Sequence, residues 1–233
     1  MQEIGKTISS AMYFGVVISV LSYFFGMWFI KKTKIKFLNP LLISVIIVIS
    51  FLVIFKIDYD TYNETSKYLT YLLTPTTACL AIPLYEKIEL LKKNKYAVII
   101  GISAGAITNG ITVLALCAVF GLSHTDFVTL LPKTVTTAIG VGLSEELGGN
   151  PSITAATVAV TGIFGNIVAP LVLKVFRIKD SIAKGLALGT SSHAIGTAKA
   201  YEIGEIEGAI SGLAIGVTGI ITVGVAYLLS LVY

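Results

Sequence analysis

The sequence predicts an all-α polytopic membrane protein with about six transmembrane helices and two re-entrant or broken segments, related by an inverted repeat. The first observation is composition: hydrophobic residues make up 55% of the 233 residues and charged residues 13%, and the mean hydropathy is +0.88. A soluble domain of this composition would expose far too much apolar surface. The other two observations are long apolar runs and a pair of similar polar stretches that interrupt them.

The apolar runs have the length of membrane spans. A helix of ~20 residues crosses a bilayer, and ~17 to 25 are tolerated. We expect spans near 12–30, 38–55, 67–85, 96–120, 153–173 and 208–232. Residues 1–66 would form an N-terminal membrane-spanning region with two helices and an outer loop. Residues 67–233 would form a repeat-built core with broken segments near 133–148 and 185–204.

The two polar stretches resemble each other. Residues 189–204 read GTSSHAIGTAKAYEIG, and residues 137–148 read TAIGVGLSEELG, so that Ile139 and Gly140 match Ile195 and Gly196. Glycine, serine and threonine disfavour a continuous helix and leave backbone groups free. Inside a bilayer such backbone survives only where it is buried in protein or lines a watery cavity. A weaker third copy would start at Thr76.

The basic loops predict the orientation. Lysines cluster in loops at 31–36 and 87–95, which places both loops in the cytoplasm, the loop at 58–64 outside and the N-terminus outside. A third basic cluster, at 174–184, is cytoplasmic only if 133–148 is re-entrant. The two polar stretches then enter from opposite sides, as in the inverted repeats of secondary transporters.

Polar side chains in and around these stretches are candidates for an anion-binding site. Hydroxyls and a lysine that follow a proline could bind an anionic substrate. Alternatively, the Lys133 side chain could extend to the membrane surface, and the hydroxyls could bond to the backbone of their own helix. Similarly, the asparagines could pack helices together, and His193 could be a buried packing residue. The candidates are Lys133, Thr136, Thr137, Thr190, Ser191, Ser192, His193, Thr197, Asn109, Asn166, Thr76 and Thr77.

Three residues are candidates for an ion or proton path: Glu146, His193 and Glu202. A carboxylate at membrane depth is costly and marks such paths, and a histidine titrates near neutrality. Glu202 could instead pair with Lys199, three residues earlier on a helix.

Several chemistries are not expected. No cluster with metal-ligand spacing is present, and neither a G-x-S-x-G elbow nor a cofactor motif occurs. Cys79 and Cys117 lie in apolar runs, which indicates free thiols and no disulfide. The net charge of +4 comes from the short lysine-rich loops, so it is a topology signal and predicts no nucleic-acid partner. We therefore expect no enzyme, no metal and no cofactor.

Four motifs resemble the LrgB/CidB family of bacterial membrane proteins: LNPLL from Leu38, TPTTACLAIPLYEKI, LPKTVTTAIG and GLALGTSSHAIGTAKAYE. The resemblance covers nearly the whole chain. It implies a multi-pass protein of the bacterial cytoplasmic membrane, often encoded beside a holin-like LrgA/CidA-type subunit. It also implies two functions: antiholin-like control of murein hydrolase activity, autolysis and programmed cell death, or transport of small carboxylates such as pyruvate, glycolate or glycerate.

The residues favour a transporter of small carboxylates. Transport coupled to protons is one version of this prediction. A holin-like structural protein requires only helices that pack and assemble, whereas this sequence supplies two glycine-broken segments with hydroxyls, a histidine and a lysine. The antiholin-like regulator is the alternative. We expect the lipid bilayer, a carboxylate, an LrgA/CidA-type subunit and further copies of the same chain as partners.

Overall fold

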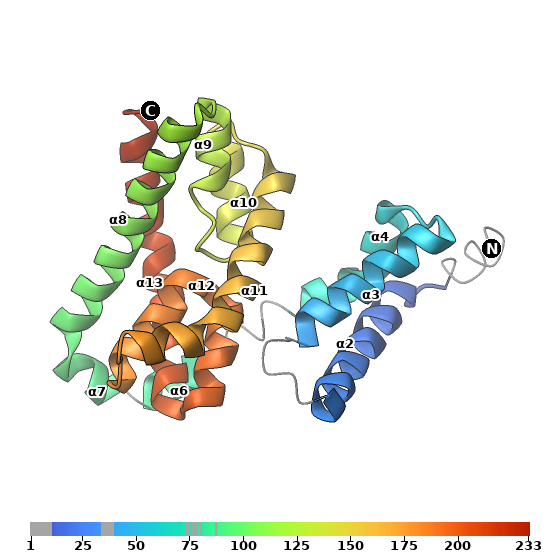
Figure 1. Cartoon of the computed structure of the whole chain (residues 1–233), viewed down its shortest axis with the longest axis horizontal. Coiled ribbons are helices and arrows are strands. Elements are labelled where there is room, and N and C mark those ends of the chain that lie inside the picture. Colours follow the sequence, from blue (N-terminus) through green and yellow to red (C-terminus); the bar gives the residue numbers. More distant parts are fainter. Residues whose placement is uncertain (1–10, 34–39, 73–74, 76–78, 80, 87) are drawn as a thin grey trace. The chain divides into compact units, whose positions relative to one another are not determined.

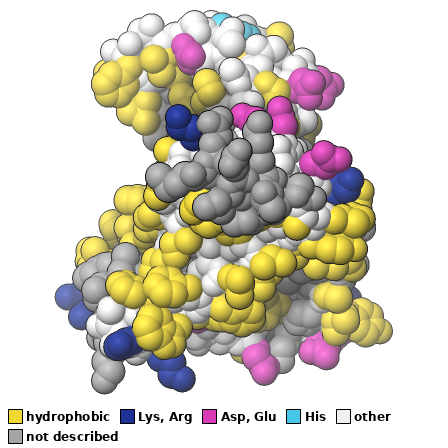
Figure 2. All heavy atoms as spheres, turned by 90° about the vertical axis from the view of Figure 1, so that its right-hand side faces the viewer, with side chains coloured by type: hydrophobic (Ala, Val, Ile, Leu, Met, Phe, Trp, Pro, Cys, Tyr) yellow, Lys and Arg dark blue, Asp and Glu magenta, His cyan; other side chains and the backbone are white. Residues whose placement is uncertain are grey.

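The computed structural model describes residues 11–33, 40–72, 75, 79, 81–86 and 88–233. Within these ranges all regular secondary structure is helical, which confirms the all-α prediction (Figure 1). The chain divides into two compact units, Met1–Cys79 and Leu80–Tyr233. Many large hydrophobic side chains in both units are exposed, as expected of surfaces that face lipid (Figure 2).

The N-terminal unit contains α2 (Phe14–Thr33), α3 (Pro40–Phe55) and α4 (Tyr59–Tyr71). The helix α2 is apolar and long enough to cross a membrane, whereas α3 is a shorter apolar helix of 16 residues. Glycines allow α2 to approach its neighbours: a Cβ on Gly15 would lie 2.7 Å from the Tyr62 carbonyl oxygen, and one on Gly26 would lie 2.7 Å from that of Pro40. Close backbone packing therefore holds the three helices together.

The predicted outer loop at 58–64 is wrong, because α4 starts at Tyr59. Its hydroxyls fit a helix that lies against α2: Thr65 Oγ1 bonds to the Thr61 carbonyl at 2.8 Å and accepts the Gly15 N–H at 3.0 Å. The predicted span at 67–85 begins inside α4, and much of its remaining length lies outside the described residues.

The C-terminal unit contains three long apolar helices with the length of membrane spans: α8 (Lys95–Phe120), α11 (Pro151–Val175) and α13 (Glu205–Ser230). They confirm the spans predicted at 96–120, 153–173 and 208–232 within a few residues. The helix α11 runs opposite to α8 and α13 (Figure 1). Shorter elements complete the unit: α6 (Ala81–Glu86), α7 (Ile88–Lys93), α9 (His124–Leu130), α10 (Thr137–Glu146) and α12 (Ser181–Ile203).

The first broken segment is a hairpin made of α9, a non-helical stretch at 131–136, and α10. Ser123 and Asp126 form a capping box that starts α9. After α10 the chain returns to α9, because the Asn150 N–H donates to Thr129 Oγ1 at 2.8 Å and Thr154 Oγ1 donates to the Thr129 carbonyl at 2.9 Å. The segment therefore enters the unit and leaves it at the same end, as predicted for a re-entrant element.

The second broken segment is α12, whose helix is interrupted at Ser192 and His193. A Cβ on Gly196 would lie 2.5 Å from the Leu188 carbonyl oxygen. Residues eight apart on a straight helix are ~12 Å apart, so the two halves of α12 fold back on each other. The hairpin also closes at its ends, where Lys184 Nζ lies 3.7 Å from Glu207 Oε1.

The two hairpins are related by an inverted repeat. One lies where α8 ends and α11 begins, and the other lies where α11 ends and α13 begins, at the opposite end of the unit (Figure 1). Matched residues make matched contacts: a Cβ on Gly219 would lie 2.7 Å from Ile139 Cδ1, and one on Gly162 would lie 2.9 Å from Ile195 Cδ1. The predicted all-helical fold class with two broken segments is thereby confirmed, although only four helices in the described residues, and not about six, have the length and composition of a membrane span.

Each hairpin has its own apolar cluster against α8 and α13. One cluster includes Phe127, Val128 and Leu131 of the first hairpin. The other joins Leu186 of the second hairpin to Ile102 and Ile210. Because lipid tails are as apolar as these side chains, van der Waals packing, and not removal from water, stabilises each hairpin at these places. The hairpins are therefore packed parts of the unit.

Opposite entry of the hairpins predicts opposite accessibility of the two ends of α11. In a background without Cys79 and Cys117, single cysteines at Asn150 and Lys179 should react with a membrane-impermeant thiol reagent from opposite sides of the membrane. The measurement is labelling in right-side-out and inverted vesicles. Labelling of both positions from one side would contradict the inverted arrangement.

Candidate functional site

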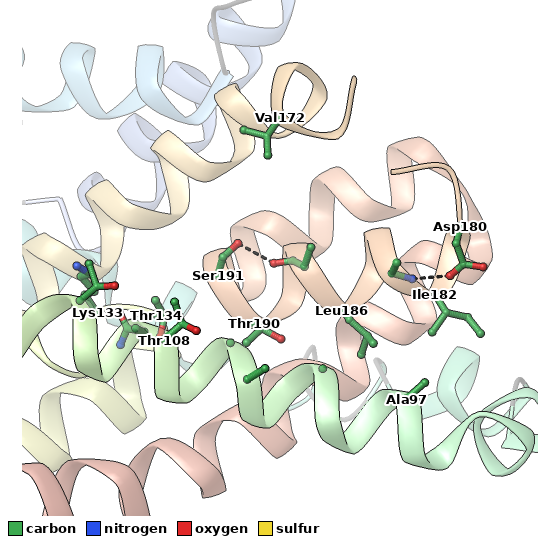
Figure 3. Close-up of a pocket in the computed structure, with 17 residues that line it drawn as sticks. Ala97, Thr108, Lys133, Thr134, Val172, Asp180, Ile182, Leu186, Thr190 and Ser191 are labelled. Atoms are coloured by element: carbon green, nitrogen blue, oxygen red, sulfur yellow. Dashed lines mark hydrogen bonds between the residues drawn. The ribbon is translucent and has the colours of Figure 1, made fainter. Parts of the chain in front are cut away.

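A cavity of about 860 Å³ lies in the C-terminal unit between α8, the first break, the end of α11 and the first half of α12 (Figure 3). Its size suits a small-molecule ligand. It combines a largely small and aliphatic wall with hydroxyl, amide and charged groups. The lining residues are Ala97, Gly101, Ala104, Gly105, Thr108, Asn109, Thr112, Lys133, Thr134, Val172, Asp180, Ile182, Ala183, Leu186, Ala187, Thr190 and Ser191.

One face of α8 forms a wall of this cavity. Gly101, Gly105, Thr108 and Thr112 recur every three or four residues, so they lie along the same stripe of the helix. Gly105 is required for the approach of α12, since a Cβ there would collide with the Thr190 methyl group. Small residues thus bring the second hairpin close to α8 and leave hydroxyls facing the cavity.

The first break, at residues 131–136, contains one charged residue, Lys133. It follows Pro132 in the non-helical stretch between α9 and α10, and its side chain is half-buried. Within the described part of the chain Lys133 forms no ion pair. A half-buried ammonium without a carboxylate favours an anionic ligand, because burial removes part of its hydration.

Two threonine hydroxyls in the cavity lining lack hydrogen-bond partners. Thr134 Oγ1 and Thr190 Oγ1 are both buried and make no hydrogen bond in the described structure. A buried polar group left unpaired costs about 1–3 kcal/mol, so such groups usually bind water or a ligand. Figure 3 shows Thr134 next to Lys133 at the first break, and Thr190 on α12, where that helix faces α8.

Asn109 and Asn166 bind the backbone of the two breaks. Asn109 Nδ2 donates to the Leu131 carbonyl at 2.9 Å, and Asn166 Nδ2 donates to the Ile195 carbonyl at 3.1 Å. Leu131 lies in the non-helical stretch, so the Asn109 amide satisfies a carbonyl that a continuous helix would have paired, whereas Ile195 lies in the helical second half of α12, just after the break. Asn109 also lines the cavity, whereas Asn166 does not.

His193 and its neighbours hold the second hairpin together and do not line the cavity. His193 is 4% exposed, and its Nε2 lies 3.0 Å from the Val158 carbonyl oxygen. Thr197 Oγ1 donates to the His193 carbonyl at 3.0 Å and lies 2.8 Å from Ser211 Oγ. Ser192 Oγ lies 3.1 Å from Ser191 Oγ, at the edge of the cavity. Of the predicted hydroxyl cluster, only Thr190 and Ser191 line the same space as Lys133.

The remaining predicted residues lie elsewhere. Thr136 is the N-cap residue of α10 but makes no side-chain cap bond, and Thr137 is exposed at the first turn. Glu146 is exposed, and Glu202 pairs with Lys199 at 2.6 Å, as the three-residue spacing predicts. Thr76 and Thr77 lie outside the described residues.

Among the polar residues that line the cavity, four were not on the list of candidates: Thr108, Thr112, Thr134 and Asp180. Thr108 and Thr112 could have been predicted from the sequence, because a stripe of glycine and threonine on an apolar helix indicates a face that lines a polar space. Thr134 adjoins Lys133 in sequence. Asp180 gave no signal, because its place at the cavity depends on how α12 folds back.

The fold and the cavity define a polytopic membrane protein built on an inverted repeat of broken hairpins. The chain belongs to the LrgB-like family, whose model matches residues 19–232. Similar relatives are the antiholin-like protein LrgB of Bacillus cereus (strain B4264) and that of Bacillus anthracis (strain A0248). Each is 38% identical over 212 residues, which cover 91% of this chain and 92% of the relative. No solved structure matches this chain.

The backbone at the second break is strained, which yields a prediction for His193. Its φ of 41° and ψ of −136° are readily adopted only by glycine. Both His193→Gly and His193→Ala lose the imidazole, but only glycine relieves the strain. We expect His193→Gly to have a higher free energy of unfolding than His193→Ala by about 1–2 kcal/mol. Thermal unfolding in detergent would measure this, and a more stable alanine variant would refute the broken conformation.

Proposed function

We propose that this protein transports small carboxylates across the bacterial cytoplasmic membrane and binds them in the cavity beside Lys133. The observation that carries the proposal is a cavity with a half-buried ammonium and two hydroxyls for which the described part of the chain supplies neither an ion pair nor a hydrogen-bond partner. Ammonium and hydroxyl donors together fit a carboxylate that carries a neighbouring hydroxyl or keto oxygen.

The contribution of each group follows from its chemistry. Lys133 would neutralise the carboxylate, and the adjacent Thr134 hydroxyl would donate a hydrogen bond to it. Thr190 would bind the second oxygen function from the second hairpin. Because these residues come from both repeats, the ligand would contact both halves of the unit.

The inverted repeat supports alternating access. In transporters with this plan, broken helices form the site and one part moves against the other. The cavity extends along α8 towards the first turn of that helix. This end of α8 adjoins α7, which carries Lys92 and Lys93. With the basic ends in the cytoplasm and the N-terminus outside, this cavity reaches towards the cytoplasmic side. A proton path through buried His193 would lie within the second hairpin.

An antiholin-like role is the second candidate function, and the names of the relatives favour it. In that role the protein would act with an LrgA/CidA-type subunit on murein hydrolase activity, and the cavity would have no substrate. Loss of the lysine charge separates the two functions. Transport requires Lys133, whereas a packing role in the membrane tolerates Lys133→Gln.

Two threonine variants test the site against simple loss of fold. Thr190→Val removes a hydroxyl with no partner among the described residues, so uptake should fall about tenfold or more while the free energy of unfolding stays unchanged or rises. Thr197→Val removes a hydroxyl that bonds to His193 and Ser211, so unfolding should become easier by about 1–3 kcal/mol. The measurements are uptake of labelled pyruvate, glycolate and glycerate into proteoliposomes, and thermal unfolding.

Lys133→Gln and Lys199→Gln complete the comparison. Lys133→Gln should lower uptake at least as much as Thr190→Val does. Lys199 is paired with Glu202 and lies outside the cavity lining, so Lys199→Gln should leave uptake near the wild-type rate. Wild-type uptake by both Lys133→Gln and Thr190→Val would remove the proposed site. Absence of uptake by the wild-type protein, alone and with an LrgA-like subunit, would favour the antiholin-like function.

A further inference from the structure

Two charges line the cavity, and they lie at opposite ends. Among the 17 lining residues only Lys133 and Asp180 carry a formal charge (Figure 3). Lys133 lies with Thr108 and Thr134, whereas Asp180 lies with Ile182 at the other end. All other lining side chains are aliphatic, hydroxyl or amide groups, or glycine.

Asp180 is held in place by the start of α12. It is the N-cap residue, and its Oδ1 accepts the Ala183 N–H at 2.8 Å. A helix N-terminus favours a negative charge at this position. The side chain is exposed, so its carboxylate acts on ions that approach through this end of the cavity.

Nearby basic side chains do not cancel this charge by direct contact. Within the described residues Asp180 forms no ion pair, and Lys184 is paired with Glu207 at 3.7 Å. Lys179 and Arg177 are exposed in the same loop and attract any anion to this end. Their attraction for an anion therefore opposes the repulsion that Asp180 exerts on it, and neither effect removes the other.

The two lining charges are too far apart to neutralise each other. Along α8, Ala97 lies towards the Asp180 end and Thr108 lies at the Lys133 end. Eleven residues of helix span about 16 Å, which exceeds the screening length of ~8–10 Å in physiological salt. An anion entering from the Asp180 end thus meets one carboxylate first and one ammonium later.

We propose that Asp180 is a specificity-determining residue that favours monocarboxylates over dicarboxylates. Coulomb energy is proportional to charge, so Asp180 repels a dianion twice as strongly as a monoanion at the same place. At the inner end Lys133 supplies one positive charge, which neutralises one carboxylate only. This inference rests on the proposed transport function and concerns the charge selectivity of the same cavity.

Asp180→Asn tests the inference with little structural change, because asparagine is as good an N-cap residue as aspartate. Initial uptake of labelled glycerate and labelled malonate into proteoliposomes, at about pH 8 where their carboxylates are ionised, gives kcat/KM for a monoanion and a dianion. We expect the malonate-to-glycerate ratio of kcat/KM to rise about two- to fivefold in low salt, and the increase to shrink at about 0.5 M salt.

Asp126→Asn is the matched control, because Asp126 is a capping carboxylate at the start of α9, outside the cavity lining. Its ratio should equal that of the wild type. An unchanged ratio in Asp180→Asn, or an equal rise in both variants, would overturn the role of Asp180 and leave the transport function standing. Absence of glycerate uptake by the wild-type protein would overturn the transport function and this inference together.

Discussion

The structure depends on one constraint: backbone that leaves the helix within the membrane must find hydrogen-bond partners inside the protein. The chain places an asparagine amide against the backbone at or just after each break. Asn109 on α8 binds the Leu131 carbonyl in the first break, and Asn166 on α11 binds the Ile195 carbonyl after the second. Each amide lies on the long helix that precedes its hairpin, so the solution repeats with the inverted repeat.

Two groups of buried hydroxyls near the breaks have different consequences. Thr129, Thr154, Thr197 and Ser211 bond within the protein and fix the hairpins against their neighbouring helices. Within the described residues Thr134 and Thr190 have no partner and line the cavity, whereas Thr218 and Thr222 of α13 also lack partners but lie outside the cavity lining. The first group stabilises the fold, whereas the second retains binding capacity for a ligand. This division supports a transporter more than a purely structural membrane protein.

Much of the fold could be predicted from the sequence, because composition and apolar length determine the membrane class, and charge with internal similarity determines the hairpin orientation. The site was predicted only in part. Lys133, Thr190, Ser191 and Asn109 reach one cavity, but His193 does not, because the break turns its ring towards α11. Which way a side chain points at a break depends on backbone angles that residue types do not specify. The helix that starts at Tyr59 was predicted to be a loop for a different reason: its sequence is polar, and a polar sequence does not indicate that the segment packs on α2 as a helix.

The most direct test of the account is ligand protection of the cavity. In the protein without Cys79 and Cys117, a cysteine introduced by Ser191→Cys, an exposed position in the cavity lining, should react with an anionic thiol reagent, and millimolar glycerate should slow this reaction severalfold. A cysteine introduced at Asn150, outside the cavity lining, should react at the same rate with and without glycerate. Protection confined to position 191 is the predicted result. Equal reaction rates at position 191 with and without glycerate, pyruvate and glycolate would contradict carboxylate binding in this cavity.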